Sequence, residues 1–394
     1  MDAAKDGDTI IVYSGTYEEN VDVNKELTII SQSGNPEDTI VQAFKITANN
    51  VTINGFKLDG GNREIRLDGA QYNNISNNEF YQISLISSSN NKVKNNICNG
   101  GIHCLSLSGS DNNLLSNNSI SAMEFAIFIE NSNNNILIGN NIGGEHPLWL
   151  RYSCNNTMSD NSISGVWEVI DLLYSSNNTM SNNYVSGIEL GIMVSHSNNT
   201  TMNNNYVSGA QGIIIGSSSY CIMSNNTVSA QGLNGFSLSN SNNNILKDNI
   251  VVEDEHYSMR YSFYLGSSNN NILTGNIARR TKLEEGCSNI HLNNSNSNLI
   301  YNNYFNSTNN VYDNGNNIWN ITKTPGTNII GGPFLGGNYW SDYAGADTNG
   351  DGLGDTLLPY NSEGQIANGG DYLPLVTPAE PPAAECITVN NGAG

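Results

Sequence analysis

Residues 178–185 read Asn-Thr-Met-Ser-Asn-Asn-Tyr-Val, and this phrase decides the fold. Within it, the apolar Met180 is followed three positions later by Asn183, and two positions after that by the apolar Val185. The phrase occurs eleven times between Ile75 and Phe305, at steps of 18, 22, 22, 21, 22, 22, 21, 23, 27 and 27 residues. Self-similarity at a nearly fixed period predicts stacked units that bury their apolar faces on one another.

Each repeat is too short for a pair of helices, and apolar residues lack helical spacing. Instead, short apolar runs such as Gly-Ile-Ile-Ile at 212–215 alternate with clusters of Asn, Ser and Gly. This alternation is typical of brief strands separated by turns. We therefore predict an all-β fold, a right-handed parallel β-helix of about 13 coils with roughly 22 residues each, closed by a C-terminal cap.

Three segments are expected along the chain: the β-helix over 1–306, a C-terminal cap with a calcium loop over 307–376, and a Pro-rich tail over 377–394. The tail contains a possible short strand at 385–389. The first eight residues read like the end of a helix that enters the first strand, so we expect a longer precursor.

Two polar columns accompany the repeat. The Asn in third place suits a corner, because Asn tolerates the left-handed backbone region and its amide can bond to the amides of the coils above and below. A Ser five positions before ten of the eleven apolar anchors, such as Ser153 before Met158, is expected to form a similar column. Because Leu, Ile and Val hold the anchor position elsewhere, the Met column of 158, 180, 202 and 223 is expected in the core. The repeated Asn residues are Asn78, Asn96, Asn118, Asn140, Asn161, Asn183, Asn205, Asn226, Asn249, Asn276 and Asn303.

The charge balance excludes some partners. The chain has 15 basic and 36 acidic residues, a formal net charge of −21. Nucleic acid is therefore not an expected partner, since phosphate contacts need a basic surface, and anionic membranes are disfavoured for the same reason. No run of apolar residues is long enough to span a bilayer. Among the six cysteines, Cys98 with Cys104 and Cys287 with Cys386 remain possible disulfide pairs.

Motifs at both ends carry a family resemblance. Residues 7–21, from Gly-Asp-Thr-Ile to Gly-Thr-Tyr-Glu-Glu-Asn-Val, resemble the opening of the NosD-type parallel β-helix family, as do the Asn-Asn-x-Ile repeats. Residues 337–343 (Gly-Asn-Tyr-Trp-Ser-Asp-Tyr), 347–356 and 371–375 resemble the closing module of archaeal cell-surface members. The resemblance implies the β-helix fold and export to the cell surface. Name-giving members assist copper-site assembly, but the five His residues here lack the HxH or HxxxH spacing that would support copper.

A metal motif lies within the closing module. Asp347, Asn349, Asp351 and Asp355 alternate around Gly352 and Gly354, which matches the oxygen-ligand spacing that calcium requires. We predict a structural calcium ion that clamps the cap. A plain Asp/Gly turn is the alternative.

A column of acidic and amide residues follows the anchors by eight to twelve positions. If these side chains line one edge of the rod, the tryptophans of the same coils make that edge a candidate glycan-binding surface, through ring stacking and hydroxyl bonding. The glycan-binding prediction rests on Glu124, Glu145, Trp149, Trp167, Glu168 and Glu189. The column continues with Gln211, Gln231, Glu255 and Glu284 or Glu285. A solvated edge that keeps the rod soluble is the alternative, and longer coils near Arg260, Arg279 and Arg280 are a second-choice site.

These observations favour an exported, non-catalytic surface protein. We predict a structural or adhesive rod that binds glycans, associates with other surface proteins, or self-assembles end to end or through its C-terminal tail. The alternative is a carbohydrate-active enzyme (lyase, hydrolase or epimerase) that uses the acidic column. Convergence of three or more carboxylates with a His, Arg or Lys in one pocket would favour the enzyme. Sequons that are candidates for glycosylation of an exported chain include Asn50, Asn155, Asn177, Asn225, Asn306 and Asn320.

Overall fold

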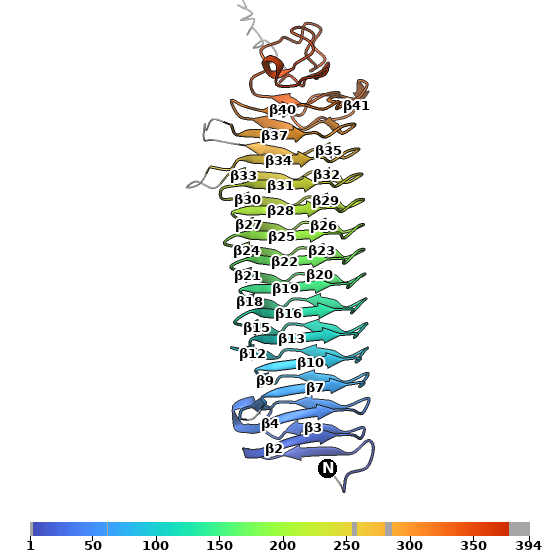
Figure 1. Cartoon of the computed structure of the whole chain (residues 1–394), viewed down its shortest axis with the longest axis vertical. Helices are drawn as coiled ribbons and strands as arrows, with labels where there is room; N and C mark the ends of the chain where they lie inside the picture. The colour runs from blue at the N-terminus through green and yellow to red at the C-terminus, as the bar shows by residue number, and fades with distance from the viewer. Residues whose placement is uncertain (1–2, 61, 254–257, 280–285, 378–394) are drawn as a thin grey trace, which may run out of the picture.

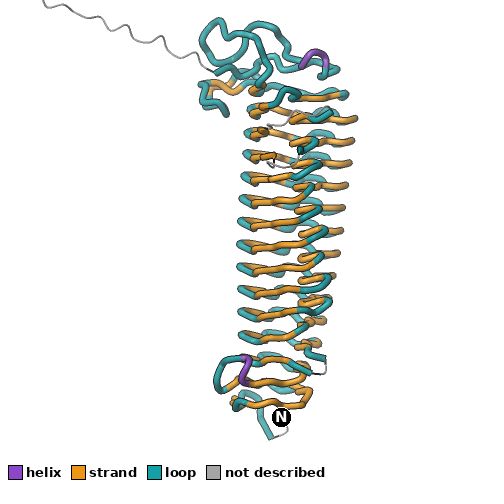
Figure 2. The backbone as a smooth tube through the Cα atoms, turned by 90° about the vertical axis from the view of Figure 1, so that its left-hand side faces the viewer, coloured by secondary structure: helices purple, strands orange, loops and turns teal. Residues whose placement is uncertain are grey.

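The computed structural model describes residues 3–60, 62–253, 258–279 and 286–377. The chain forms a long rod of stacked coils, with the N-terminal end at the bottom and a loop-rich C-terminal cap at the top (Figure 1). The rod is a right-handed parallel β-helix of about 13 turns, which confirms the predicted fold. Seen from the side, each coil lies almost flat on the one below it (Figure 2).

Each regular coil contributes one strand to each of three faces. The short face is a sheet of 14 parallel strands that begins near the N-terminus. Its strands are β1 (Thr9–Val12), β3 (Thr28–Ser31), β5 (Thr52–Asn54), β8 (Asn74–Ser76), β11 (Lys92–Lys94), β14 (Leu114–Ser116), β17 (Ile136–Ile138), β20 (Thr157–Ser159), β23 (Thr179–Ser181), β26 (Thr201–Asn203), β29 (Ile222–Ser224), β32 (Ile245–Lys247), β35 (Ile272–Thr274) and β38 (Leu299–Tyr301).

The long face carries the longest regular strands. They are β7 (Glu64–Asp68), β10 (Gln82–Ile86), β13 (His103–Ser108), β16 (Phe125–Glu130), β19 (His146–Arg151), β22 (Glu168–Leu173), β25 (Leu190–Ser195), β28 (Gln211–Gly216), β31 (Asn234–Ser239), β34 (Tyr261–Gly266), β37 (Ser288–Asn293) and β40 (Val311–Asp313).

The third face is built from two- to four-residue strands. They are β6 (Lys57–Leu58), β9 (Glu79–Phe80), β12 (Ile97–Asn99), β15 (Ser119–Ser121), β18 (Asn141–Gly144), β21 (Ser162–Gly165), β24 (Tyr184–Gly187), β27 (Tyr206–Gly209), β30 (Thr227–Ala230), β33 (Ile250–Glu253), β36 (Ile277–Arg279), β39 (Tyr304–Asn306) and β43 (Tyr339–Trp340). The long and third faces join at the N-terminal end, where β2 (Gly15–Val23) pairs with β4 (Thr39–Ile46), and β4 pairs with both β6 and β7. A short 3₁₀ helix, η1 (Pro36–Asp38), precedes β4.

The interior is a narrow apolar column. Met158, Met180, Met202 and Met223 are all fully buried, which confirms that the methionine column belongs to the core. Alternation along each strand places the intervening side chains outside. The core therefore follows the anchor positions of the repeat.

The predicted Asn ladder is present at one corner. The side-chain amide of Asn161 donates to Oδ1 of Asn183 at 3.0 Å and to the carbonyl of Leu137 at 3.0 Å. In turn, its Oδ1 accepts from the backbone N–H and the side-chain amide of Asn140, at 2.9 and 3.0 Å. The same pattern runs from Asn78 to Asn338, so each buried amide is satisfied by its neighbours above and below.

Two further columns support neighbouring corners. In the predicted Ser column, the backbone N–H of Ser153 donates to the hydroxyl of Ser175 at 3.0 Å. A second Asn column, two residues before the anchors, was not predicted; there the N–H of Asn135 donates to Oδ1 of Asn156 at 2.8 Å. All three columns join successive coils through side chains as well as strands.

The residue just before the ladder Asn explains the sequence pair Asn-Asn. Asn182 has a φ of 56° and Asp160 a φ of 56°, which is the left-handed region, and Gly139 holds the same position at 66°. Asn, Asp and Gly adopt this conformation most readily. The first residue of the pair therefore makes the turn, and the second builds the ladder.

The C-terminal cap continues the stack before it becomes irregular. Strand β40 pairs with β37, and β43 pairs with β39, so parallel pairing extends past residue 306, where we expected the β-helix to end. Beyond the stack lie the antiparallel pair β41 (Thr324–Pro325) and β42 (Phe334–Leu335) and the 3₁₀ helix η2 (Ser362–Gly364). The fully buried Asp371 accepts from the N–H of Asn338 at 2.7 Å and from the indole of Trp340 at 2.9 Å, which fixes the cap to the end of the ladder.

The expected tail strand at 385–389 lies outside the described residues, as does Cys386. Cys98 and Cys104 form a disulfide with a Cα–Cα separation of 5.9 Å, one of the two pairings that the sequence left open. Within the part of the chain that the structure describes, no helix has the length and apolarity to cross a membrane.

Candidate functional site

The outer side of the long face carries two rows of side chains that run along the rod. The first outer row consists of the residues at which the long strands begin, and the second lies three residues further along each strand. The first row includes His103, Phe125, His146, Glu168, Leu190, Gln211, Asn234 and Tyr261. The second row is Ser106, Phe128, Trp149, Asp171, Met193, Ile214, Ser237, Tyr264, His291 and Tyr312.

A hollow of about 260 Å³ opens where strands β16, β19 and β22 lie side by side. We call it the aromatic hollow; it is lined by Phe125, His146, Trp149, Glu168 and Asp171. The rings of Phe125 and Trp149 stack at 4.8 Å between centroids, with an interplanar angle of 18°, and Phe125 and His146 stack at 5.3 Å. Parallel strands place these rings one coil apart, which makes a platform along the rod.

Two carboxylates lie against this platform. Nδ1 of His146 is 3.1 Å from Oε2 of Glu168, at side-chain exposures of 30% and 41%. Burial raises the pKa of Asp171 to about 6, and the negative charge of Glu168 adds to that rise. The indole N–H of Trp149 opposes it, although its geometry falls short of a hydrogen bond. The hollow therefore holds Glu168 beside a second carboxyl, that of Asp171, whose pKa is raised to about 6.

Several buried polar atoms at this place have no hydrogen-bond partner among the described residues. They are Nε1 of Trp149, Oδ1 of Asp171 and Nε of Arg151, which belong to neighbouring strands. An unpaired buried donor or acceptor costs about 1–3 kcal/mol. An unpaired donor of Trp149 and an unpaired acceptor of Asp171 thus lie in the hollow, whereas Arg151 is not among its lining residues. The amides of the Asn ladder, in contrast, are satisfied.

The structure separates the residues of the predicted acidic column. Trp149 and Glu168 lie in the aromatic hollow, whereas Glu124, Glu145 and Glu189 lie in the turns that precede the long strands. Trp167 occupies that turn position in its own coil and is 46% exposed. A single continuous acidic edge is therefore wrong. Glu255, Glu284, Glu285 and Arg280 lie outside the described residues.

Sequence reasoning missed Phe125 and Asp171. Asp171 follows Trp149 by 22 residues, one repeat length, so the signal was present in the spacing of the second outer row. Asp171 was missed because the acidic column was assigned from the turn residues that precede each long strand, and not from positions along the strands. Glu145 follows Glu124 by 21 residues, but Glu168 follows Glu145 by 23. Turn lengths vary between coils, so the spacing of turn residues varies with them. Pairing of the long strands then restores the alignment of residues between coils.

The C-terminal Asp/Asn loop is closed by its own hydrogen bonds. Oxygens of Asp347 accept from the backbone N–H groups of Gly350 and Gly352, both at 2.7 Å, while Asp355 accepts from Thr348 at 2.7 Å. Asp351 pairs with Lys323. Among the described residues, no group of three or more His, Cys, Asp or Glu side chains is arranged to hold a metal. As built, these carboxylates do not converge, and the calcium site stays a prediction.

Most of the candidate glycosylation sequons lie at the surface. Asn50, Asn155, Asn177, Asn225 and Asn306 are exposed. Asn320 is half-buried, and its Oδ1 accepts from the N–H of Tyr372 at 3.2 Å.

Fold and face together define the class: a parallel β-helix protein with an aromatic, acidic outer surface. The chain belongs to the NosD family, whose model, described as periplasmic copper-binding protein (NosD), matches residues 1–146 and 145–345. No curated protein matches the sequence.

Solved structures that resemble this chain include three with low identity. The Dettilon tailspike protein gp208 is 12% identical over 72% of this chain, with a TM-score of 0.49, and this chain spans 61% of its length. DFA-IIIase from Arthrobacter chlorophenolicus A6, without its lid and in complex with GF2, is 11% identical over 72% of this chain and 87% of its own, with a TM-score of 0.49. The A-module of mannuronan C-5 epimerase AlgE6 from Azotobacter vinelandii is 11% identical over 80% of this chain and 92% of its own, with a TM-score of 0.43. These likenesses concern the fold alone.

The copper in the family description does not fit the residues of this chain. His103 and His146 are separated by the intervening ring of Phe125, and His291 lies stacked between tyrosines. The stacked methionines Met158, Met180, Met202 and Met223 are buried in the core, and Cys98 and Cys104 are bonded to each other. Copper sites need clustered His, Met or Cys ligands, and the described residues contain no group of three or more His, Cys, Asp or Glu side chains arranged to hold a metal.

Proposed function

We propose that this protein is an exported rod that binds glycans on the outer side of its long face, at the aromatic hollow. The observation that carries the proposal is the stack of Phe125, His146 and Trp149 beside Glu168 and Asp171 in one hollow. Aromatic rings pack against the apolar faces of sugar rings, and carboxylates accept from sugar hydroxyls. A bound hydroxyl would also satisfy the unpaired atoms of Trp149 and Asp171.

Export is supported by two observations. The family description names the periplasm, the described part contains the Cys98–Cys104 disulfide, and such bonds persist mainly in oxidising compartments. The closing motif resembles archaeal cell-surface members, so we propose the cell surface as the final location. Fractionation of cells of the source organism, with antibody detection, tests this part of the proposal.

Two tryptophans of consecutive coils provide a matched test of binding. Trp149 lies in the hollow, whereas Trp167 is exposed in the turn before β22. Purified protein and both Trp→Ala variants would be titrated with neutral oligosaccharides by isothermal calorimetry. We expect Trp149→Ala to weaken binding by about 10- to 100-fold and Trp167→Ala to leave it within about twofold. Unchanged affinity in Trp149→Ala, or no binding by the wild-type protein, would refute the proposal.

A carbohydrate-active enzyme is the second candidate, and one observation favours it. Glu168 and Asp171 share a hollow, and the pKa of Asp171 is raised to about 6, which suits a proton donor near neutral pH. The hollow contains two carboxylates and one His, fewer than the three carboxylates that we required for chemistry. Release of shorter or unsaturated sugars by the wild-type protein, lost in Asp171→Asn, would make catalysis the better description.

Self-assembly is proposed on weaker grounds, because the C-terminal tail lies outside the described residues. Electron microscopy of the native protein, with and without a calcium chelator, tests it. Filaments that dissociate on chelation would support both assembly and the calcium clamp, and single rods under both conditions would refute assembly.

A further inference from the structure

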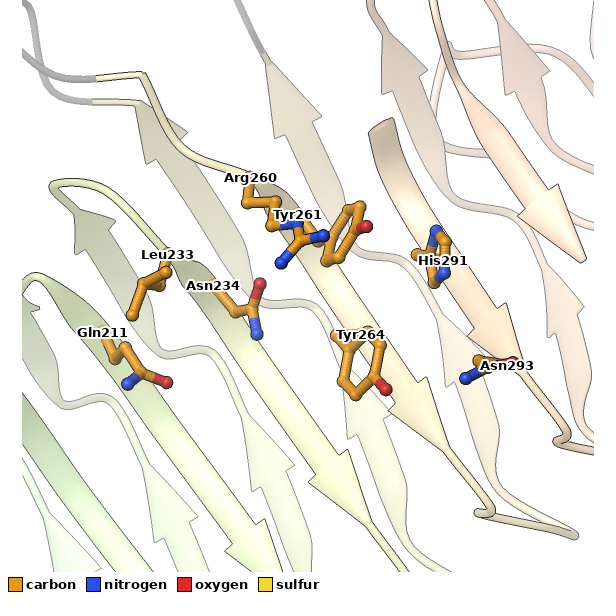
Figure 3. A pocket seen from close by; sticks show the side chains of 8 residues that line it. All are labelled: Gln211, Leu233, Asn234, Arg260, Tyr261, Tyr264, His291 and Asn293. Atoms are coloured by element: carbon orange, nitrogen blue, oxygen red, sulfur yellow. The ribbon is translucent and has the colours of Figure 1, made fainter. Parts of the chain in front are cut away.

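A second hollow of about 260 Å³ lies on the same face, closer to the C-terminal cap. It extends across strands β28, β31, β34 and β37, and the labelled side chains that line it lie on and beside these neighbouring strands (Figure 3). We call it the tyrosine hollow. The residues used below are Gln211, Asn234, Tyr261, Tyr264, His291 and Asn293.

The tyrosine hollow repeats the ring platform of the aromatic hollow. Tyr261 and Tyr264 both stack on the ring of His291 in the next strand, at 4.3 and 5.7 Å between centroids. His291 in turn stacks on Tyr312 at 4.5 Å, one coil further. The guanidinium of Arg260 lies 5.2 Å above the Tyr261 ring. The rings of three consecutive coils thus stack face to face along the rod axis, with Tyr261 buried at 7% exposure.

The polar groups of this hollow suit uncharged hydroxyls. Burial lowers the pKa of His291 to about 4, and the charge of Arg260 adds to that effect, so the imidazole is neutral at neutral pH. Oδ1 of Asn234 is buried without a hydrogen-bond partner in the described part of the chain. The amides of Gln211 and Asn293 lie at its sides. Amides and neutral imidazole both donate to and accept from hydroxyls.

The second outer row connects the two hollows. From Asp171 it continues through Met193, Ile214 and Ser237 to Tyr264, which is four strand steps. At about 4.8 Å per step, this distance is roughly 19 Å. The side chains between the hollows, Met193, Ile214 and Ser237, are half-buried or buried, and none of them carries a ring. A monosaccharide cannot reach both hollows, but a linear oligosaccharide can.

We infer that the tyrosine hollow is a second subsite of the same binding surface, and that the two hollows together bind one linear, uncharged polysaccharide parallel to the rod axis. The inference rests on the proposed glycan-binding function. Uncharged sugars are favoured because the chain carries a net charge of −21 and the aromatic hollow contains Glu168 and Asp171, so a polyanion would be repelled.

The test compares ligand length with substitution at each hollow. The probes are glucan oligosaccharides of both β-1,4 and α-1,4 linkage, from disaccharide to octasaccharide, titrated by calorimetry. We expect the octasaccharide of the recognised series to bind about tenfold more tightly than the tetrasaccharide. Tyr264→Ser should remove this advantage and leave the tetrasaccharide affinity unchanged, while Trp149→Ala should weaken both. Serine is chosen because Ser237 holds the same position in the preceding strand, so folding is preserved.

Tyr184→Ala is the matched control. Tyr184 stacks on Tyr206 at 5.0 Å in an exposed pair of rings, but on the third face, so its loss should change neither affinity. If Tyr264→Ser retains the length advantage while Trp149→Ala loses binding, the second subsite is refuted and the proposed function stands. If neither oligosaccharide series binds, both are refuted. Tighter binding of galacturonan oligomers than of glucan oligomers of equal length would overturn the inference that the polysaccharide is uncharged.

Discussion

The Asn corner and the outer side of the long face obey opposite rules within the same coils. At the corner, one residue type recurs from Asn78 to Asn338, and each side chain bonds to its counterparts above and below. On the long face, the second outer row changes from Trp149 to Asp171 to Met193 in consecutive coils, and buried polar atoms remain unpaired. Positions that repeat the same residue, such as the Asn corner, join neighbouring coils. Positions that vary from coil to coil, such as the second outer row, give the surface different side chains along the rod.

The largest expected effect is at the corner. Asn161→Ala removes an amide that makes four hydrogen bonds to neighbouring coils, and it leaves the backbone N–H of the buried Asn140 without its acceptor. We expect a loss of about 3 kcal/mol in the free energy of unfolding, measured by chemical denaturation. Asn141→Ala, at an exposed position on the third face one coil before Asn161, is the control and should cost less than about 0.5 kcal/mol. Equal costs would break the distinction between corner and surface.

The next effect is a gain that depends on pH. Burial, with help from Glu168, raises the pKa of Asp171 from 3.8 to about 6, so the folded state binds this proton more tightly than the unfolded chain. Its contribution to stability is complete below pH 3.8 and is lost as pH rises through about 6. Asp171→Asn has no carboxyl that ionises in this range. Its free energy of unfolding should therefore rise by up to about 2 kcal/mol relative to that of the wild type between pH 4 and pH 7.

The charged groups around Asp171 belong to its own strand and to β19. They are Glu168, His146 and Arg151, because the facing residues of β25, Leu190 and Met193, are apolar. The stability difference between wild type and Asp171→Asn, measured by denaturation across that pH range, isolates the single carboxyl from the other acids. A difference that does not change with pH would contradict the desolvated carboxyl.

A smaller stability effect is expected for the largest side chain on the long face. Trp149→Ala should cost only about 1 kcal/mol, because the indole is half-buried and its main loss is ring stacking on Phe125 and an edge-to-face contact with Phe128. Thermal or chemical denaturation measures this cost beside that of Asn161→Ala. If the tryptophan matters more to stability than the small amide, the ring platform is part of the structural framework, and its assignment to binding loses support.

The smallest expected effect concerns the C-terminal Asp/Asn loop, whose side chains hydrogen-bond to other residues of the same loop. If calcium binds as the spacing predicts, Asp351 must release Lys323. Lys323→Gln should then bind calcium a few-fold more tightly than wild type, a gain of less than about 1 kcal/mol. Calorimetric titration with calcium measures both affinities. No binding by either protein would refute the site, and tighter binding by wild type would refute the competition.

The Asn corner could be predicted because the same residue type recurs at the same position of the repeat. Eleven Asn residues at equivalent positions predicted the ladder, and stacking in register made the amide contacts necessary. The buried methionines followed from the same count. The aromatic hollow was predictable only in part: Trp149 and Glu168 were identified, but Phe125 and Asp171 each appear once, and no repetition distinguishes them from other surface residues. Their neighbourhood depends on turn lengths that vary from coil to coil, as the shift between Glu145 and Glu168 illustrates.

The uniform ladder has a consequence for how such a molecule changes length. Because every coil meets the next through the same side-chain contacts, one additional repeat of about 22 residues fits anywhere in the shaft without a new kind of interface. The interval between two surface features then grows by one fixed increment of about 4.8 Å, while each feature keeps its own residues. Duplication or loss of single repeats between the two hollows would therefore change their separation only in whole steps of one coil.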